Sequence, residues 1–218
     1  MKNKCWVVKI GSALLTNNGK GIDKDLISEW VEQIVELKSY DIDVVLVSSG
    51  SIVEGMKRLG WKDKPSDIHK LQAAAAVGQM GLVQAYEYLF AEYKVQTAQV
   101  LLTQDNLTNT KHFENISATL ENLLEFGAVP VINENDTVAT EEIKFGDNDT
   151  LAALVANLLG AERLIILTDQ HGVFDDDPRI NKNASLIKEI NFDDEKLERV
   201  AGKTGGILGS GGMYSKVM

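Results

Sequence analysis

Five short runs of apolar, mostly β-branched residues are the feature that most constrains the fold of this 218-residue chain. The runs occupy residues 6–10, 44–47, 100–102, 129–132 and 164–167. Unbroken runs of this kind are typical of strands buried on both faces, as in parallel sheets that are covered by helices. The sequence therefore predicts an α/β protein with a mainly parallel central sheet.

Helical periodicity fills the stretches between these runs. Residues 26–37 carry apolar side chains at intervals of three and four, and Asp23 is placed to cap that helix. Residues 68–93 predict one long, Ala-rich helix, and residues 112–126 and 150–159 predict two more. Strands that alternate with helices in this way indicate an α/β sandwich.

The composition is that of an ordinary globular protein, with 44% hydrophobic and 25% charged residues. The 22 Lys and Arg against 32 Asp and Glu give a net charge of −10, which disfavours binding to nucleic-acid phosphates. The single cysteine, Cys5, excludes an internal disulfide and suits a reducing compartment. No run approaches the roughly 20 apolar residues of a membrane span, and no signal-peptide core is present. We expect a soluble, cytoplasmic, single-domain protein in which residues 140–145 form a short hairpin arm.

Polar residues and glycines follow four of the five predicted strands. These segments are residues 9–12, 48–51, 133–137 and 168–172. Ligands of open α/β sheets bind outside the carboxyl ends of the strands, where such residues suit phosphates and polar groups. Turns of this composition are also common without a ligand, so it is their recurrence at four strand ends that indicates a site.

A glycine-rich segment at residues 205–212 could either cradle anionic oxygens or serve as a flexible loop. Known nucleotide motifs do not fit it, because Leu197 replaces the first glycine of a Walker A pattern and Tyr214 replaces the third glycine of the dinucleotide fingerprint. No histidine or cysteine cluster has metal-ligand spacing, so we expect no zinc site and assign no metal-ligating residue. Lys9 is different, because a lysine inside a buried strand is costly unless it reaches an anion.

Together these segments resemble the amino acid kinase family. The resemblance is carried by KIGS at 9–12, SSGSI at 48–52, NENDTV at 133–138, FGDND at 145–149, TDQ-x-GVF at 168–174, DPR at 177–179 and GGM-x-SK at 211–216. NENDTV and FGDND are most similar to the members that phosphorylate glutamate in proline biosynthesis. The resemblance implies a three-layer αβα sandwich and phosphoryl transfer from ATP, with Mg²⁺, to the γ-carboxylate of L-glutamate.

The resemblance also implies residue roles. Lys9 and Lys216 would flank the transferred phosphoryl group, and Asp149 would position them. The glutamate-binding set would be Ser49, Gly50, Asn133, Asp136 and Asn148, with Asp136 paired to the substrate ammonium. The ATP-binding set would be Lys9, Gly11, Thr168, Asp169, Ser210, Gly211, Gly212, Met213, Tyr214, Ser215 and Lys216. A γ-carboxylate is ionised at neutral pH and needs no general base, which suits motifs without a catalytic histidine.

Alternatives remain open within and outside this family. N-acetylglutamate kinase is the nearest, although the acetylated nitrogen of its substrate carries no charge for Asp136 to pair with. A non-catalytic amino-acid sensor of the same fold is disfavoured by the intact lysines and Asp149. An NAD-linked dehydrogenase is disfavoured by the missing fingerprint.

The resemblance further implies a homo-oligomer, since family members are usually dimers or tetramers, and residues 71–81 could pack closely against a partner. It implies feedback inhibition by proline in the glutamate pocket. Two departures from the family accompany these expectations. Ser210 and Ser215 stand where the family usually has threonines, and the chain ends at Met218, where the family continues through a helix and further strands. We expect one domain over residues 1–218 that lacks its C-terminal end, and no RNA-modification-type (PUA) domain.

Overall fold

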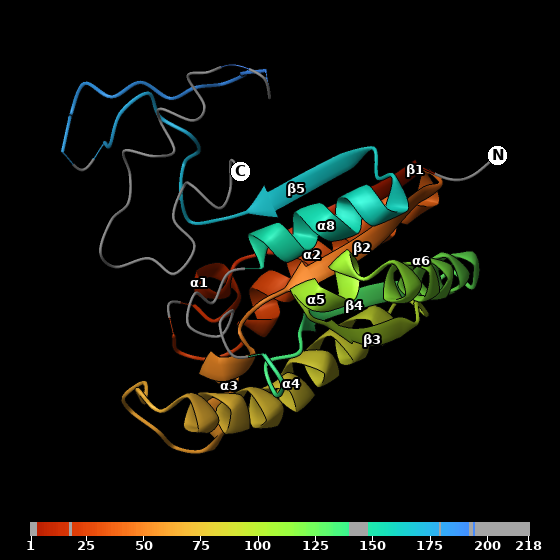
Figure 1. Cartoon of the computed structure of the whole chain (residues 1–218), viewed down its shortest axis with the longest axis horizontal. Helices are drawn as coiled ribbons and strands as arrows, with labels where there is room; N and C mark the ends of the chain where they lie inside the picture. Colours follow the sequence, from red (N-terminus) through yellow and green to blue (C-terminus); the bar gives the residue numbers. More distant parts are fainter. Residues whose placement is uncertain (1–3, 18, 140–147, 179, 192–193, 195–218) are drawn as a thin grey trace.

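A parallel sheet of five strands forms the centre of the protein in the computed structural model, which describes residues 4–17, 19–139, 148–178, 180–191 and 194 (Figure 1). The strands are β1 (Lys4–Ile10), β2 (Ile42–Ser48), β3 (Thr97–Leu102), β4 (Val129–Glu134) and β5 (Arg163–Leu167). Their order is β3-β4-β2-β1-β5, and every neighbouring pair is parallel. Each of the five predicted runs lies within one of these strands, so the predicted sheet is confirmed.

Helices connect the strands. They are α1 (Ser12–Leu15), α2 (Lys24–Ser39), α3 (Ser51–Arg58), α4 (Ile68–Ala91), α5 (Gln104–Thr108), α6 (Thr110–Glu125) and α8 (Asp149–Leu159). The four predicted helices correspond to α2, α4, α6 and α8, and the predicted Asp23 cap accepts a hydrogen bond from the Leu26 amide at 3.1 Å. Helices α1, α3 and α5 were not predicted. The expected hairpin arm at residues 140–145 lies outside the described residues. No helix in the described part of the chain is long and apolar enough to cross a membrane.

The sheet separates two hydrophobic clusters, because successive strand residues point to opposite faces. Val44 and Leu46 of β2 pack with α2 and α4 on one face. Val45 and Val47 pack with α6 and α8 on the other face. Figure 1 shows the helices on both sides of the sheet. The expected three-layer αβα sandwich is therefore confirmed.

Helices α3 and α4 approach each other closely through glycines. A Cβ atom at Gly78 of α4 would overlap the Ser51 carbonyl oxygen, and one at Gly55 of α3 would overlap the Ala74 carbonyl oxygen. Only glycine lets two backbones come this close. Within residues 71–81, Ala74 and Gly78 thus make the close contact with α3 of the same chain, whereas Ala73 and Ala76 are exposed. This contact holds the start of α3 at the carboxyl end of β2, beside the site described next.

Candidate active site

The carboxyl ends of the parallel strands bring the predicted site segments to one edge of the sheet. The Gly11 amide, after β1, donates to the Leu167 carbonyl of β5 at 3.1 Å. The Ser49 amide, after β2, donates to the Ile10 carbonyl of β1 at 3.3 Å. These hydrogen bonds join neighbouring strand ends, so side chains that are more than a hundred residues apart in sequence share one surface.

Lys9 and Asp149 form a buried ion pair at this edge. Lys9 is the penultimate residue of β1, and Asp149 is the first residue of α8, which covers that face of the sheet. The Lys9 Nζ lies 2.5 Å from the Asp149 Oδ1, and the two side chains are 6% and 1% exposed. A Cβ atom at Gly11 would lie 4.0 Å from the Lys9 Nζ, so the ammonium lies beside a stretch of backbone without a side chain. The buried lysine therefore has its anion, as expected, and its ammonium lies beside Gly11, where no side chain intervenes.

Two asparagines beside this pair are fixed by hydrogen bonds. The Asn148 Nδ2, just before α8, donates to the Ser48 carbonyl at 3.0 Å and to the Asn133 Oδ1 at 2.7 Å. The Asn133 Oδ1 also accepts from the Glu134 amide at 2.9 Å. Both asparagine side chains are buried. A hydrogen bond thus connects the side-chain amide of Asn133, on β4, with that of Asn148, just before α8.

Four of the five predicted glutamate-binding residues line one small pocket. Its volume is about 110 Å³, and Ser49, Gly50, Asn133 and Asn148 are among the residues that surround it. Gly50 has a φ of 98°, in the left-handed region that favours glycine, and it turns the chain from β2 into α3. A Cβ atom there would also lie 2.9 Å from the Leu15 Cδ2. Glycine at position 50 therefore serves the backbone turn and the close packing of the pocket wall.

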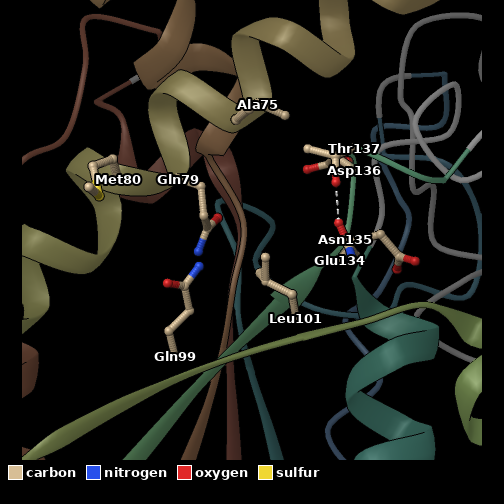
Figure 2. Close-up of a pocket in the computed structure, with 10 residues that line it drawn as sticks. Ala75, Gln79, Met80, Gln99, Leu101, Glu134, Asn135, Asp136 and Thr137 are labelled. Carbon is tan, nitrogen blue, oxygen red and sulfur yellow. Dashed lines mark hydrogen bonds between the residues drawn. The ribbon is translucent and has the colours of Figure 1, made fainter.

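The fifth predicted residue, Asp136, lines a neighbouring pocket of about 390 Å³ (Figure 2). Its Oδ2 accepts a hydrogen bond from the Ser51 hydroxyl at 3.0 Å, and Ser51 lines the smaller pocket. Burial raises the pKa of Asp136 to about 6, and the Ser51 hydrogen bond works against that rise. A carboxylate that is poorly solvated gains more than usual from a nearby cation. Asp136 is therefore well suited to receive a positively charged group.

Thr168 and Asp169 follow β5 at the other side of this edge. The Thr168 hydroxyl donates to the Asp169 Oδ1 at 3.3 Å and accepts from the Gln170 amide at 3.3 Å. Since β1 lies between β2 and β5, Lys9 stands between the asparagine-lined pocket and this segment. The remaining predicted ATP-binding residues, Ser210, Gly211, Gly212, Met213, Tyr214, Ser215 and Lys216, lie outside the described residues.

Comparison with known proteins identifies the family. The family model described as "Amino acid kinase family" matches residues 4–218. The chain belongs to the amino acid kinase family. The expected resemblance is thereby confirmed, and the parallel sheet with its helical layers agrees with it.

Curated relatives named glutamate 5-kinase are similar over almost the whole chain. The chain is 59% identical over 217 residues to that of Hydrogenovibrio crunogenus, covering 100% of this chain and 58% of the relative. It is 61% identical over 212 residues to that of Alcanivorax borkumensis, covering 97% and 56%. It is 60% identical over 212 residues to that of Pseudomonas syringae pv. tomato, covering 97% and 57%. The chain thus spans a little more than half the length of these amino acid kinases.

Kinases of this family act on ATP, which usually binds together with Mg²⁺. The described residues can therefore be searched for side chains that could coordinate a metal ion. No group of three or more His, Cys, Asp or Glu side chains within the described ranges could hold a metal ion. Mg²⁺ in phosphoryl-transfer sites is usually held by phosphate oxygens together with one or two carboxylates.

Three residues at this edge were given no role of their own from the sequence, although Ser51 lies within the predicted segment 48–51. Ser51 bonds to Asp136, as described above. The Gln79 Oε1 of α4 accepts from the Asn133 Nδ2 at 2.7 Å, and the Tyr86 hydroxyl lies 3.1 Å from the Ser48 Oγ. Burial raises the pKa of Tyr86 above its ordinary value, with the Ser48 hydrogen bond opposing the rise. The sequence could have indicated Gln79, because a polar residue within the apolar stripe of a long helix is unusual and suggests a specific contact.

Proposed function

We propose that this chain catalyses transfer of the γ-phosphoryl group of ATP to the γ-carboxylate of L-glutamate, giving L-glutamate 5-phosphate and ADP in the first step of proline biosynthesis. The observation that carries the proposal is the meeting, at one sheet edge, of the buried Lys9–Asp149 pair with an asparagine-lined pocket. About 60% identity to relatives named glutamate 5-kinase supports it.

The chemistry of this reaction suits the residues present. The acceptor carboxylate, with a reference pKa near ~4.3, is already ionised at neutral pH. The obstacle is repulsion between this anion and the triphosphate, so catalysis consists mainly of positioning and charge stabilisation. Lys9 would supply positive charge beside Gly11, and Asp149 would hold the ammonium in place. Lys216 would supply a second positive charge. Mg²⁺ bound to the ATP phosphates would reduce their charge further.

The two substrates would lie on opposite sides of β1. Glutamate would occupy the pocket at β2 and β4, with its ammonium at Asp136 and the rest of the amino acid against Ser49, Gly50, Asn133 and Asn148. ATP would lie at the β5 end, against Thr168, Asp169 and the segment from Ser210 to Lys216. Lys9, between the two, would meet the phosphoryl group as it passes from one side to the other. The poorly solvated Asp136 favours free glutamate over N-acetylglutamate, because only free glutamate carries an ammonium.

A coupled assay of ADP release by the full-length protein tests this proposal directly. L-Glutamate, N-acetyl-L-glutamate and a blank without amino acid are compared at saturating ATP and Mg²⁺. We expect glutamate-dependent ADP release and none above the blank with N-acetylglutamate. Release with N-acetylglutamate instead would identify the other kinase. Calorimetric binding of glutamate without any ADP release would support a sensor.

The cellular setting is proposed on family grounds. We propose a single amino acid kinase domain in a cytoplasmic homo-oligomer, either a dimer or a tetramer, in which proline competes with glutamate for the same pocket. Light scattering of the full-length protein gives the oligomeric state. Steady-state inhibition kinetics show whether proline raises the glutamate KM, as competition requires.

A further inference from the structure

We propose that Gln79 of α4 is a positioning residue that sets the orientation of the Asn133 and Asn148 amides in the glutamate pocket. Gln79 lines the larger pocket together with Asp136, but it is not among the residues that line the smaller pocket with Asn133 and Asn148. The inference rests on the proposed function, since it concerns how the proposed glutamate pocket is kept ready for its substrate.

The contacts form a continuous buried chain. The Gln79 Oε1 accepts from the Asn133 Nδ2 at 2.7 Å, and the Asn133 Oδ1 accepts from the Asn148 Nδ2 at 2.7 Å. The Asn148 Nδ2 donates in addition to the Ser48 carbonyl. Gln79 is 8% exposed, and both asparagines are more deeply buried. The chain therefore runs from α4 through β4 to the start of α8 in a region where each unmet hydrogen bond is costly.

The direction of each hydrogen bond shows what Gln79 contributes. The Asn133 Oδ1 receives two N–H donors, one from Asn148 and one from the Glu134 backbone. Its Nδ2 must then point the other way, where the Gln79 Oε1 accepts from it. Without that acceptor, a buried NH₂ group is left unsatisfied, and the Asn133 amide gains by rotating toward any other acceptor. Rotation would turn an N–H toward Asn148 and break the contact that holds Asn148.

A purely structural role explains Gln79 poorly. Its other amide atom, Nε2, is buried and has no hydrogen-bond partner among the described residues. Figure 2 shows the Gln79 amide directed toward that of Gln99 across the larger pocket. An apolar side chain at this place in the stripe of α4 would avoid burying a half-satisfied amide. The Gln79 atom that does form a hydrogen bond, Oε1, is the one that contacts Asn133. The hydrogen bond to Asn133 therefore explains why a glutamine stands at this position.

Three variants of the full-length protein test the proposal by their KM values. Gln79→Met keeps an unbranched chain of similar length and removes the acceptor. Gln79→Glu keeps an acceptor oxygen. Gln84→Met is the matched control, because Gln84 lies on the same helix and is exposed. We expect Gln79→Met to raise the glutamate KM about tenfold while the ATP KM changes less than about twofold. Gln79→Glu should stay within about threefold of wild type, and Gln84→Met should match wild type.

Several outcomes would overturn the proposal. A glutamate KM that is unchanged in Gln79→Met would do so, as would equal rises in the glutamate and ATP KM values. A Gln79→Glu variant as impaired as Gln79→Met would also overturn it, because restoring the acceptor must restore binding.

Crystal structures of wild type and Gln79→Met without ligands separate this proposal from the proposed function. We expect the Asn133 amide to be rotated in the variant and its contact with the Asn148 Nδ2 to be lost or lengthened. An unchanged Asn133–Asn148 contact would refute the positioning role whatever the activity. Absence of glutamate-dependent ADP release in wild type would refute the proposed function instead, and the two structures would still decide the role of Gln79.

Discussion

At the scale of single residues, the Lys9–Asp149 pair combines a structural and a proposed catalytic role, because both charges are buried. Removing one partner of a buried pair typically costs about 3–5 kcal/mol, whereas replacing both with apolar residues is often nearly neutral. We therefore expect Lys9→Met to lower the free energy of unfolding by about 3 kcal/mol. Lys9→Met combined with Asp149→Leu should recover most of that loss and remain inactive. Urea unfolding and ADP release measure the two effects.

Lys4→Met provides the control for these variants. The Lys4 Nζ lies 3.3 Å from the Glu162 Oε1 in a pair whose side chains are 67% and 40% exposed. Exposed pairs contribute about 0–1 kcal/mol, so Lys4→Met should leave stability and activity almost unchanged. The roles given to the buried pair would be wrong if Lys9→Met lowered the free energy of unfolding as little as Lys4→Met does. They would also be wrong if the variant that combines Lys9→Met with Asp149→Leu still released ADP.

The pH dependence of kcat/KM for glutamate should reveal the ionisation of the Asp136 carboxyl. Burial raises the pKa of its carboxyl to about 6, and only the carboxylate can pair with the substrate ammonium. We expect kcat/KM for glutamate, divided by that of the Asp136→Asn variant, to fall about tenfold per pH unit below pH 6. Any titration of the nucleotide affects both enzymes and cancels in the ratio. A ratio that stays constant between pH 5 and 7 would exclude Asp136 as the ammonium partner.

The same pKa shift predicts the effect of Asp136 on stability. Because the pKa in the folded protein exceeds the ordinary value of 3.8, the folded state binds more protons between about pH 4 and pH 6. The free energy of unfolding should therefore fall by about 1–3 kcal/mol as the pH rises through this window. Asp136→Asn should remove that fall, and urea unfolding at pH 4.5 and 7 compares the two proteins. An equal pH dependence in the variant would assign the effect to another group.

At the scale of elements, the sequence allowed the strands to be predicted and left several helices unrecognised. Runs such as residues 44–47 are continuous because both faces of β2 are buried, so their pattern follows directly from the fold. Helix α3 has only eight residues, and a helix that short is stabilised by packing rather than by its own sequence. Its packing partner, α4, lies further along the chain. The role of Ser51 at the start of α3 could not be predicted without that contact.

The α3–α4 contact should control the glutamate pocket through Gly78. Gly78→Ala places a methyl group against the Ser51 carbonyl, and overpacking of this kind costs about 1–3 kcal/mol. We expect α3 to shift, to weaken the Ser51–Asp136 hydrogen bond, and to raise the glutamate KM several-fold more than the ATP KM. Gly127→Ala is the control, since its positive φ adds strain in open space away from the site. A destabilised Gly78→Ala protein with a normal glutamate KM would show that the position of α3 does not govern the pocket.

At the scale of the whole molecule, the location of the site and the pairing of Lys9 with Asp149 were predictable, and the other contacts within the site were not. Parallel strands end at one edge, so the segments after β1, β2, β4 and β5 had to meet there once the sheet was predicted. The order of the strands does not follow from the periodicity of any run. It places Lys9 between the asparagine-lined pocket and the Thr168–Asp169 segment, and it brings Gln79 of α4 against Asn133. Gln79 and Tyr86 therefore became recognisable as neighbours of the site only in the folded arrangement.

In the proposed reaction, the γ-carboxylate of glutamate attacks ATP at this edge of the sheet. Glutamate labelled with ¹⁸O in its γ-carboxylate tests it most directly, with the full-length protein, ATP, Mg²⁺ and hydroxylamine to cleave the acyl phosphate at carbon. We expect γ-glutamyl hydroxamate and inorganic phosphate that carries one ¹⁸O atom from glutamate. Phosphate released without ¹⁸O, in amounts matching ADP, would contradict the account.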